Sequence, residues 1–516
     1  MTNELTEQIP ARAGRREWLG LGVIALACAL YSMDLTVLHL AVPVLAVDLE
    51  PSSTQLLWII DIYGFMLAGC LITTGSLGDR IGRRRLLLIG AAAFGCASVA
   101  AAYSTSPEML IATRAVLGVA GATLAPSTLA LIRTMFSDAE QRTTAVGIWI
   151  TSFSIGAVVG PAVGGVLLEF FWWGSVFLIN LPVMVVLLVL APRILPEFRD
   201  VDAGRADPAS AVLSLAAILA LVYAIKHTAQ GGFSGVSAVT AVAGCLLGWA
   251  FVRRNRRLPD PLIDPTLLRI PAFDVAIVTY GVGVLILFGG FLFLAQYRQL
   301  SLGMSPLVAG LAMVPASLAF ILATNLTPPL ARRVAPTTLI GGGLVVAAGG
   351  YVTLLTLEPG NGDWQTVIGP IVFSIGLAPL FTLTNDTIIA GVPPERAGAA
   401  TGISETSAEV GGTLGIAVLG SLAMAVYRPR VDAALAPDTT AHDADAARNT
   451  LAGALDVADR LPHDEAARLV AAAQSAFTTG LHIAAAIGAV ASIALAAFVL
   501  TVGRRVLARS EPKTLR

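Results

Sequence analysis

Residues 140–165 read "EQRTTAVGIWITSFSIGAVVGPAVGG", and residues 394–420 read "PERAGAATGISETSAEVGGTLGIAVLG". Aligning Gly147 with Gly402 brings further identical residues into register. These are Thr151 and Thr406, Ser152 and Ser407, Gly156 and Gly411, Gly160 and Gly415, and Gly165 and Gly420. Each segment has a Glu and an Arg within its first three residues and continues as a largely apolar run. The match predicts a repeated helical unit, and therefore two related halves. Chance similarity between two Ala- and Gly-rich segments is the alternative.

The composition predicts an all-α polytopic membrane protein. Of the 516 residues, 56% are hydrophobic and 13% are charged, and the mean hydropathy is +0.78, which exceeds what a soluble domain of this size needs. The net charge of −1 provides no basic field for nucleic acid. The four cysteines lie in apolar runs without metal-ligand spacing, so we expect no metal site and no cofactor.

Fourteen apolar runs reach the length of about 20 residues that a membrane-spanning helix needs. With boundaries uncertain by several residues, they are 18–46, 54–77, 84–104, 107–132, 143–168, 173–192, 208–226, 235–252, 271–298, 304–330, 335–356, 364–390, 397–426 and 476–503. The repeated segments fall in the fifth and thirteenth runs. We therefore expect two six-helix halves, 18–192 and 271–503, with two inserted helices at 208–252.

Positive charge predicts the orientation of the chain. Arginines and lysines gather in the tails 1–17 and 504–516 and in alternate short loops. Since such residues favour the cytoplasmic side, both termini are expected there, in a multi-pass protein of a bacterial plasma membrane.

The segment 427–475 is too rich in Asp and Glu to span a bilayer. Its polar and apolar residues alternate at helical spacing, so we expect an extracellular loop with one or two surface helices. A disordered spacer is the alternative.

Three short motifs bear on conformational change. "GSLGDRIGRRR" (75–85) joins the second and third spans with Gly78, Asp79, Arg80, Gly82, Arg83 and Arg84. "GAVVGPAVGG" (156–165) contains Gly156, Gly160, Pro161, Gly164 and Gly165, so that its small residues permit close helix contact and its proline bends the helix. "ATRAVLGVAGA" (112–122) places Arg114 inside the fourth span.

In this order and with fourteen spans, these motifs resemble those of the major facilitator superfamily. "MDLTVLHLAVP" (33–43) narrows the resemblance to its 14-helix drug:proton antiporters. "STQLLWIIDIYGFMLAG" (53–69) and "WWGSVFLINLPV" (172–183) are similar to their quaternary-ammonium efflux pumps.

The resemblance implies a major facilitator fold and a secondary transporter that is not an enzyme. It implies export of lipophilic cations, such as quaternary ammonium biocides and ethidium-like dyes, by alternating access and driven by the proton motive force. The expected partners are these cations, protons and membrane lipids, with the chain acting as a monomer. Export of a specific antibiotic or lipid-like metabolite, or proton symport for uptake, stays open. The tenth span has Asn325 and no acidic residue, which departs from the pumps that handle divalent cations.

Charged residues inside the spans are functional candidates because burying them in lipid is costly. The candidates for substrate binding and proton coupling are Asp34, Asp61, Arg114, Glu405 and Glu409. Asp34 is expected to line a wet cavity, whereas Asp61 and Arg114 have either a coupling or a structural role. Glu405 is expected to lie deeper than Glu409 and to couple the proton.

Aromatic residues suit a quaternary cation, which cannot donate a hydrogen bond but is attracted to π faces. The candidates are Tyr31, Trp58, Tyr63, Trp149, Phe153, Phe288, Phe291 and Phe381, with Tyr280 beside them. Simple packing is the alternative for each. For His39, packing is the favoured interpretation over titration.

Overall fold

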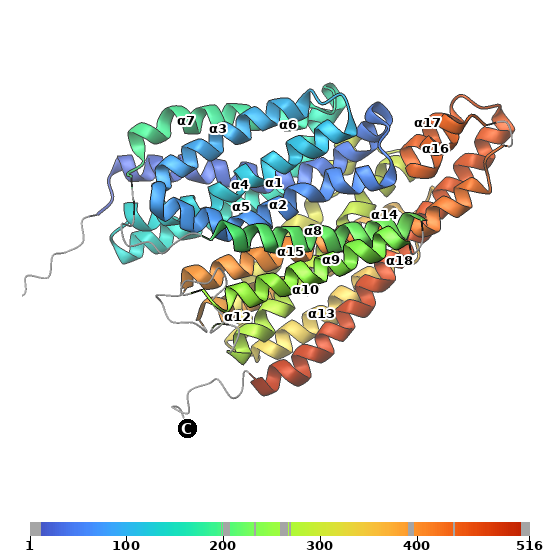
Figure 1. Cartoon of the computed structure of the whole chain (residues 1–516). Coiled ribbons are helices and arrows are strands. Elements are labelled where there is room, and N and C mark those ends of the chain that lie inside the picture. The colour runs from blue at the N-terminus through green and yellow to red at the C-terminus, as the bar shows by residue number, and fades with distance from the viewer. Residues whose placement is uncertain are drawn as a thin grey trace, which may run out of the picture.

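The computed structural model describes residues 12–197, 199, 207–231, 234–258, 267, 270–390, 397–436 and 439–506. Apart from one isolated bridge between Glu358 and Asn361, the regular secondary structure of these residues is helical. The long helices run side by side, with the start of α1 and the end of α18 at one end of the bundle and α16 and α17 at the other (Figure 1).

The first half contains seven helices. They are α1 (Arg15–Leu49), α2 (Ser53–Ile81), α3 (Arg83–Ala102), α4 (Pro107–Met135), α5 (Ala139–Phe170), α6 (Ser175–Leu178) and α7 (Asn180–Ile194). Ser52, Ser106 and Asp138 begin α2, α4 and α5, and each accepts a hydrogen bond from the backbone three residues later. Helix α5 packs on α1, both α2 and α3 pack on α4, and α7 packs on α1 and α3.

The second half repeats this arrangement. It contains α10 (Pro271–Gln296) with the π-helical turn η2 (Tyr297–Ser301), α11 (Pro306–Leu311), α12 (Val314–Ala331), α13 (Pro336–Leu354), α14 (Asp363–Ala390), α15 (Ala397–Asp432), and α18 (His463–Phe498) with the π-helical turn η4 (Val499–Gly503). Helix α15 packs on α10, both α12 and α13 pack on α14, and α18 packs on α10 and α13. Equivalent helices of the two halves therefore make equivalent contacts.

The aligned glycines explain why the sequence repeats. A methyl group on Gly156 of α5 would collide with the carbonyl oxygen of Ala29 on α1. A methyl group on Gly411 of α15 would collide in the same way with the carbonyl oxygen of Gly281 on α10. Each half thus brings its fifth helix against the backbone of its first, at a distance that only glycine permits.

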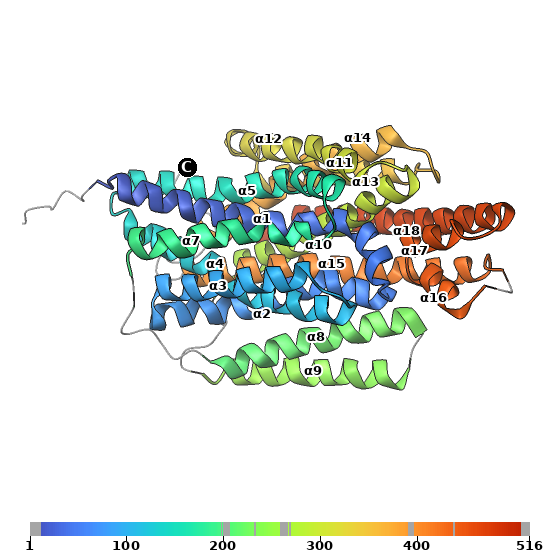
Figure 2. The same ribbon diagram turned by 90° about the horizontal axis from the view of Figure 1, so that it is seen from above.

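An inserted hairpin of α8 (Pro208–Gly231) and α9 (Gly235–Asn255) lies at the edge of the bundle (Figure 2). Helix α8 packs on α2 and on α15, so it covers the seam between the halves. Asp207 and Arg254 join the ends of the hairpin through two oxygen–nitrogen contacts of 3.0 Å. Hydrogen bonds from Arg254 lower the pKa of Asp207 to about 2, so this carboxylate stays charged at physiological pH.

The fourteen predicted spans are helical in the described part of the chain. Thirteen helices are long and apolar enough to cross a membrane, and Ala209–Ile225 in α8 provides a shorter apolar helix at the seventh predicted position. Three details differ from the prediction. The sixth span is divided between α6 and α7, the tenth span is divided between α11 and α12, and the helix of the last span begins at His463 rather than at residue 476.

The segment 427–475 is largely helical. It contains the end of α15, α16 (Ala441–Asn449), α17 (Leu451–Ala458) and the first turns of α18. It also reaches the first half of the molecule. Asn449 Oδ1 accepts a hydrogen bond from Ser53 Oγ at 3.4 Å, and His442 Nε2 lies 3.3 Å from Glu50 Oε2. The segment therefore bridges the two halves at the α16–α17 end.

The two halves also meet closely near that end. A methyl group on Gly165 of α5 would lie 2.7 Å from the carbonyl oxygen of Pro306, at the start of α11. A methyl group on Gly420 of α15 would lie 2.5 Å from Leu57 Cδ2 on α2. Because these contacts leave no room for a side chain, the two halves touch directly at both places near the α16–α17 end.

The α1–α5 contact can be tested with two glycines of the same helix. Gly156→Ala should lower the thermal unfolding temperature of the purified protein by several degrees, because the new methyl group overlaps Ala29. Gly147→Ala is the control, because a methyl group there meets no atom within 4 Å. Equal unfolding temperatures for the two variants would contradict the close contact.

Candidate functional site: a cavity between the halves

A cavity of about 290 Å³ lies between the two halves. Helices α1, α2 and α4 line it from the first half, and α10, α12, α14 and α15 line it from the second. The lining residues are Leu38, His39, Ile60, Tyr63, Gly64, Arg114, Tyr280, Val284, Leu287, Phe288, Phe320, Phe381, Ala408, Glu409, Gly412 and Ile416. The surface is mostly apolar and aromatic, with one acidic and one basic residue among those lining it.

Asp34 and Arg114 form a buried ion pair beside this cavity. Arg114 Nη1 lies 3.2 Å from Asp34 Oδ2, and their side chains are 2% and 1% exposed. Arg114 Nε also donates to the carbonyl oxygen of Ile59 at 3.1 Å, and its guanidinium lies 4.7 Å from the centre of the Tyr63 ring. The pair explains how an aspartate occupies the apolar run of α1, since each charge compensates the other.

Asn180 completes the environment of Asp34. Asn180 Nδ2 donates to Asp34 Oδ1 at 3.0 Å and to Ser98 Oγ at 3.2 Å. Asn180 is fully buried and begins α7, and Ser98 belongs to α3. Sequence reasoning did not single out either residue. The available signal was an asparagine within the apolar stretch "LINLPV". Through these bonds one carboxylate joins helices α1, α3, α4 and α7.

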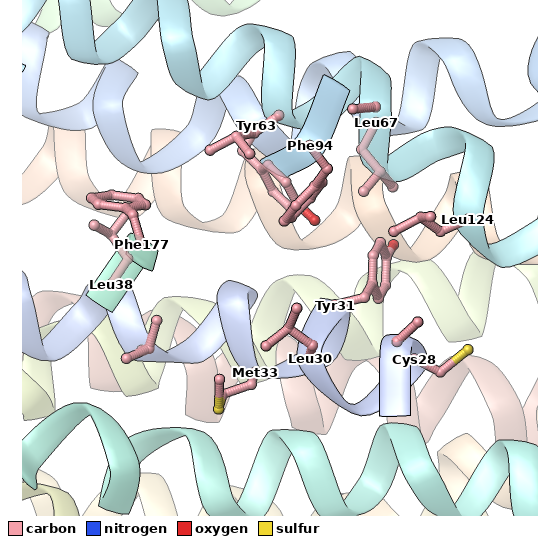
Figure 3. Packing of buried hydrophobic residues seen from close by; sticks show 14 of the residues in the cluster. Cys28, Leu30, Tyr31, Met33, Leu38, Tyr63, Leu67, Phe94, Leu124 and Phe177 are labelled. Carbon is pink, nitrogen blue, oxygen red and sulfur yellow. The ribbon is translucent and has the colours of Figure 1, made fainter. Parts of the chain in front are cut away.

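The position of Asp34 differs from the expectation that it lines the cavity. Arg114 lies on the cavity surface, whereas Asp34 is not among the lining residues. Asp34 is held away from the cavity surface because each of its two carboxylate oxygens accepts a hydrogen bond from a buried side chain, one from Arg114 and one from Asn180. Figure 3 shows the buried cluster around this region, including Tyr31, Tyr63 and Phe177.

Glu409 provides the acidic group on the cavity surface. Tyr31 on α1 donates its hydroxyl hydrogen to Glu409 Oε1 on α15 at 3.2 Å, so this bond connects the two halves. Glu405 lies one turn earlier and is not among the lining residues. Since α15 extends from Ala397 to Asp432, Glu409 is nearer the helix centre than Glu405, opposite to the predicted order of depth.

The aromatic candidates separate into three groups. Tyr280, Phe320 and Phe381 form an edge-to-face cluster on the cavity wall, with ring centres 5.5 and 5.7 Å apart, and Phe288 lines the same cavity. The second group lies behind Glu409: Phe153 contacts Tyr31 and Trp149, with ring centres 5.7 and 4.8 Å apart.

The third group packs elsewhere. Trp58 contacts Phe65, in a cluster with Val222 of the inserted hairpin. Phe291 packs against Phe373 in the core of the second half.

Asp61, the remaining charged candidate, is fully buried on α2 but is not among the residues lining the cavity. Among the described residues, no group of three or more His, Cys, Asp or Glu side chains is placed to hold a metal ion.

The α2–α3 motif makes a tight turn at the end of the bundle near the start of α1. Gly82 has φ +108°, which favours glycine, and it separates α2 from α3. Glu197 accepts a hydrogen bond from the Arg84 backbone at 3.1 Å, and its Oε2 lies 3.5 Å from Arg84 Nε. The turn is thus joined to the segment after α7. The side chain of Asp79 lies outside the described residues.

The sequence model of the Major Facilitator Superfamily matches residues 24–416, which include helices of both halves. The chain belongs to the Major Facilitator Superfamily. Its membership confirms the resemblance found in the sequence motifs. It also identifies the chain as a secondary transporter rather than an enzyme.

Two similar members of the superfamily are resistance transporters. The multidrug efflux pump LfrA of Mycolicibacterium smegmatis is 42% identical over 496 residues, covering 96% of this chain and 98% of LfrA. The methyl viologen resistance protein SmvA of Salmonella typhimurium is 35% identical over 467 residues, covering 90% and 93% of the two chains.

Solved structures of the superfamily confirm the fold. A bacterial homologue of the human lysosomal transporter Spinster, in an inward-facing and unoccupied conformation, superposes with a TM-score of 0.68. It is 16% identical, and the match covers 97% of this chain and all of that one. The peptide transporter POT in complex with sulfate gives a TM-score of 0.62 at 15% identity, with 94% of each chain covered.

The buried ion pair can be tested by removing its charges singly and together. Arg114→Gln should destabilise the protein by about 3–5 kcal/mol, because it leaves the Asp34 carboxylate buried without its cation. The double variant Asp34→Asn with Arg114→Gln should recover part of this loss in thermal unfolding.

The control is the same cycle at the more exposed pair Asp207 and Arg254, where removing one charge should cost less than it does at Asp34 and Arg114. A double variant at Asp34 and Arg114 that is no more stable than Arg114→Gln alone would contradict the compensation.

Proposed function

We propose that this chain is a proton-coupled multidrug efflux antiporter that exports lipophilic monovalent cations. The observation that carries the proposal is the position of Glu409, the acidic residue among those lining a mostly apolar and aromatic cavity between the two halves, where the charge of Arg114 is paired with Asp34. The similarity to LfrA, which is named for multidrug efflux, supports drug export. The similarity to SmvA, which is named for resistance to methyl viologen, supports export of cations but not the restriction to a single charge, since methyl viologen is a dication.

The charges around the cavity suit a singly charged substrate. Arg114 contributes one positive charge, which the buried carboxylate of Asp34 balances. Among the residues on the cavity surface, the ionised carboxylate of Glu409 then contributes one uncompensated negative charge, and its protonated form contributes none. A monovalent cation therefore fits the ionised site, and a proton fits as its alternative.

Competition between the proton and the cation gives antiport. A cation binds when Glu409 is ionised, with its lipophilic part against Tyr280, Phe320 and Phe381. Protonation of Glu409 removes the attraction, and the cation leaves. Because one carboxylate cannot carry both occupants, each transport cycle exchanges one for the other.

Alternating access requires the cavity to open to each side in turn. We assign the α16–α17 end to the outside and the end with the start of α1 to the cytoplasm of a bacterial cell, following the distribution of arginines. In this assignment the two halves touch on the outer side of the cavity. Opening the cavity to that side requires separation of α5 from α11 and of α2 from α15, together with release of the contacts of α16.

A second candidate function is export of an antibiotic that the host itself makes. The tetracenomycin C resistance and export protein of Streptomyces glaucescens is 30% identical over 494 residues, which favours this alternative. If such a compound carries no positive charge, its binding would not compete with protons at Glu409. Uptake by proton symport has no comparable support.

Glu409 and Glu405 provide a matched pair of variants for the test. Glu409→Gln should weaken ethidium binding to the purified protein by at least about tenfold, because it removes the negative charge of the site. Wild-type affinity should fall between pH 8 and pH 6, and this dependence should disappear in Glu409→Gln.

Glu405→Gln is the control, and it should bind ethidium within about twofold of the wild type with the same pH dependence. Titration of ethidium fluorescence gives both quantities. Unchanged affinity and pH dependence in Glu409→Gln would overturn the proposal. Loss of both in Glu405→Gln alone would move the site to Glu405.

A further inference from the structure

Tyr31 forms a hydrogen bond across the two halves that competition at Glu409 does not by itself require. Its hydroxyl on α1 donates to Glu409 Oε1 on α15 at 3.2 Å. Tyr31 is 5% exposed and is not among the residues lining the cavity, whereas Glu409 lines it. A substrate in the cavity therefore meets the carboxylate, while the tyrosine holds the same carboxylate from behind.

The donor of this bond is fixed to the first half. Tyr31 packs edge-to-face on Phe153 of α5, with ring centres 5.7 Å apart, and Phe153 packs on Trp149 at 4.8 Å. Trp149 Nε1 in turn donates to Thr128 Oγ1 on α4 at 3.1 Å. The tyrosine is thus connected to α4 and α5 as well as to its own helix, so its hydroxyl moves with the first half.

The acceptor is fixed to the second half. A methyl group on Gly411 would collide with the carbonyl oxygen of Gly281, and one on Gly415 would lie 2.5 Å from the carbonyl oxygen of Leu285. Both carbonyls belong to α10, so α15 is seated on the backbone of its own half just after Glu409. The bond between Tyr31 and Glu409 therefore links two bodies that alternating access moves against each other.

The strength of this link depends on what occupies the site. A hydrogen bond to an ionised carboxylate is roughly twice as strong as one between neutral groups. A proton on Glu409 removes the charge, and a cation in the cavity competes for it. Because a displacement that takes the two oxygens beyond about 3.5 Å breaks the bond, movement of the halves costs most when Glu409 is ionised and the cavity is empty.

Building on the proposed function, we propose that Tyr31 is a positioning residue that holds the empty, ionised transporter in one orientation and thereby makes the exchange obligatory. A proton that binds Glu409 from outside crosses with it and is released inside. If the empty site then returned without a cation, the cycle would dissipate the proton gradient without export. The bond from Tyr31 opposes this return and weakens when either occupant binds.

Other titratable and charged groups surround Glu409 from the helices packed around the cavity. They are Glu405 on α15, His39 on α1, Tyr63 on α2, Arg114 on α4 and Tyr280 on α10. The charge of Arg114 is balanced by Asp34. Since several of these groups influence any pH profile, the test follows the proton flux that depends on Glu409.

The test measures proton entry into liposomes that contain the purified full-length protein and a trapped pH indicator. A pH gradient is applied without any substrate cation, and valinomycin with potassium holds the membrane potential at zero. Tyr31→Phe removes the hydroxyl and keeps the ring on Phe153, and it should raise this proton leak at least about fivefold over the wild type.

Two further variants identify the origin of the leak. Tyr351→Phe is the matched control, because its hydroxyl donates to the carbonyl oxygen of Ile286 at 2.6 Å within the second half, and it should leak like the wild type. Tyr31→Phe combined with Glu409→Gln should also return to the wild-type rate, because the leaking proton travels on Glu409. A water path opened by structural damage would persist in the combined variant.

A wild-type leak rate in Tyr31→Phe, or a leak that persists after Glu409→Gln, would overturn the assignment. If Tyr31→Phe does not fold, as judged by thermal unfolding, Tyr31→Leu also lacks the hydroxyl and carries the same expectation. If an ethidium gradient moves no protons through the wild type, the proposed function fails. Exchange in the wild type with an unchanged leak in Tyr31→Phe leaves the proposed function intact and removes only the role of Tyr31.

Discussion

The ion pair between Asp34 and Arg114 is the interaction on which the rest of the site depends. An isolated charge in the middle of an apolar bundle is costly, and this pair contains two that compensate each other with side chains at most 2% exposed. Asn180 and the carbonyl oxygen of Ile59 occupy further hydrogen-bonding positions of the pair. As a result, the first half presents a guanidinium to the cavity without giving the site an excess positive charge.

The second half supplies the complementary group. Glu409 reaches the same cavity from α15, and its bond to Tyr31 connects it to the first half. The glycines that bring α5 against α1 and α15 against α10 hold these helices in register. The close packing of each half and the chemistry of the cavity therefore depend on the same pair of repeated helices. In each half, the fifth helix packs against the first helix of its own half and also contacts the other half: α5 contacts α11, and α15 contacts α2.

Much of the fold could be predicted because its signals are periodic or repeated along the sequence. Apolar runs of membrane-spanning length located the helices, and the match of Gly156 with Gly411 indicated two halves. The division between α11 and α12 has no comparable signal in its apolar run. The helices of the segment 427–475 were only partly predictable. The first turns of α18, from His463 to the predicted start of the last span at residue 476, contain charged residues and therefore do not resemble a membrane span.

The site was harder to predict because it depends on which residues of separate helices meet. An aspartate in α1 and an arginine in α4 were both recognisable, but their contact, and the resulting displacement of Asp34 from the cavity surface, required the arrangement of the helices. Asn180 stands out only as an asparagine within an apolar stretch, which does not show that it contacts Asp34. The predicted bounds of the thirteenth span, 397–426, already place Glu409 nearer its centre than Glu405, so the predicted order of depth was wrong on the sequence itself.

The central claim is that one carboxylate exchanges a proton for a cation. The most direct test is to add a lipophilic monovalent cation to the purified wild-type protein in weakly buffered detergent solution and to measure the protons released. At a pH where Glu409 is protonated before the addition, the account predicts release of about one proton for each cation bound at saturation. Binding of the cation without proton release throughout the range from pH 5 to pH 9 would contradict it.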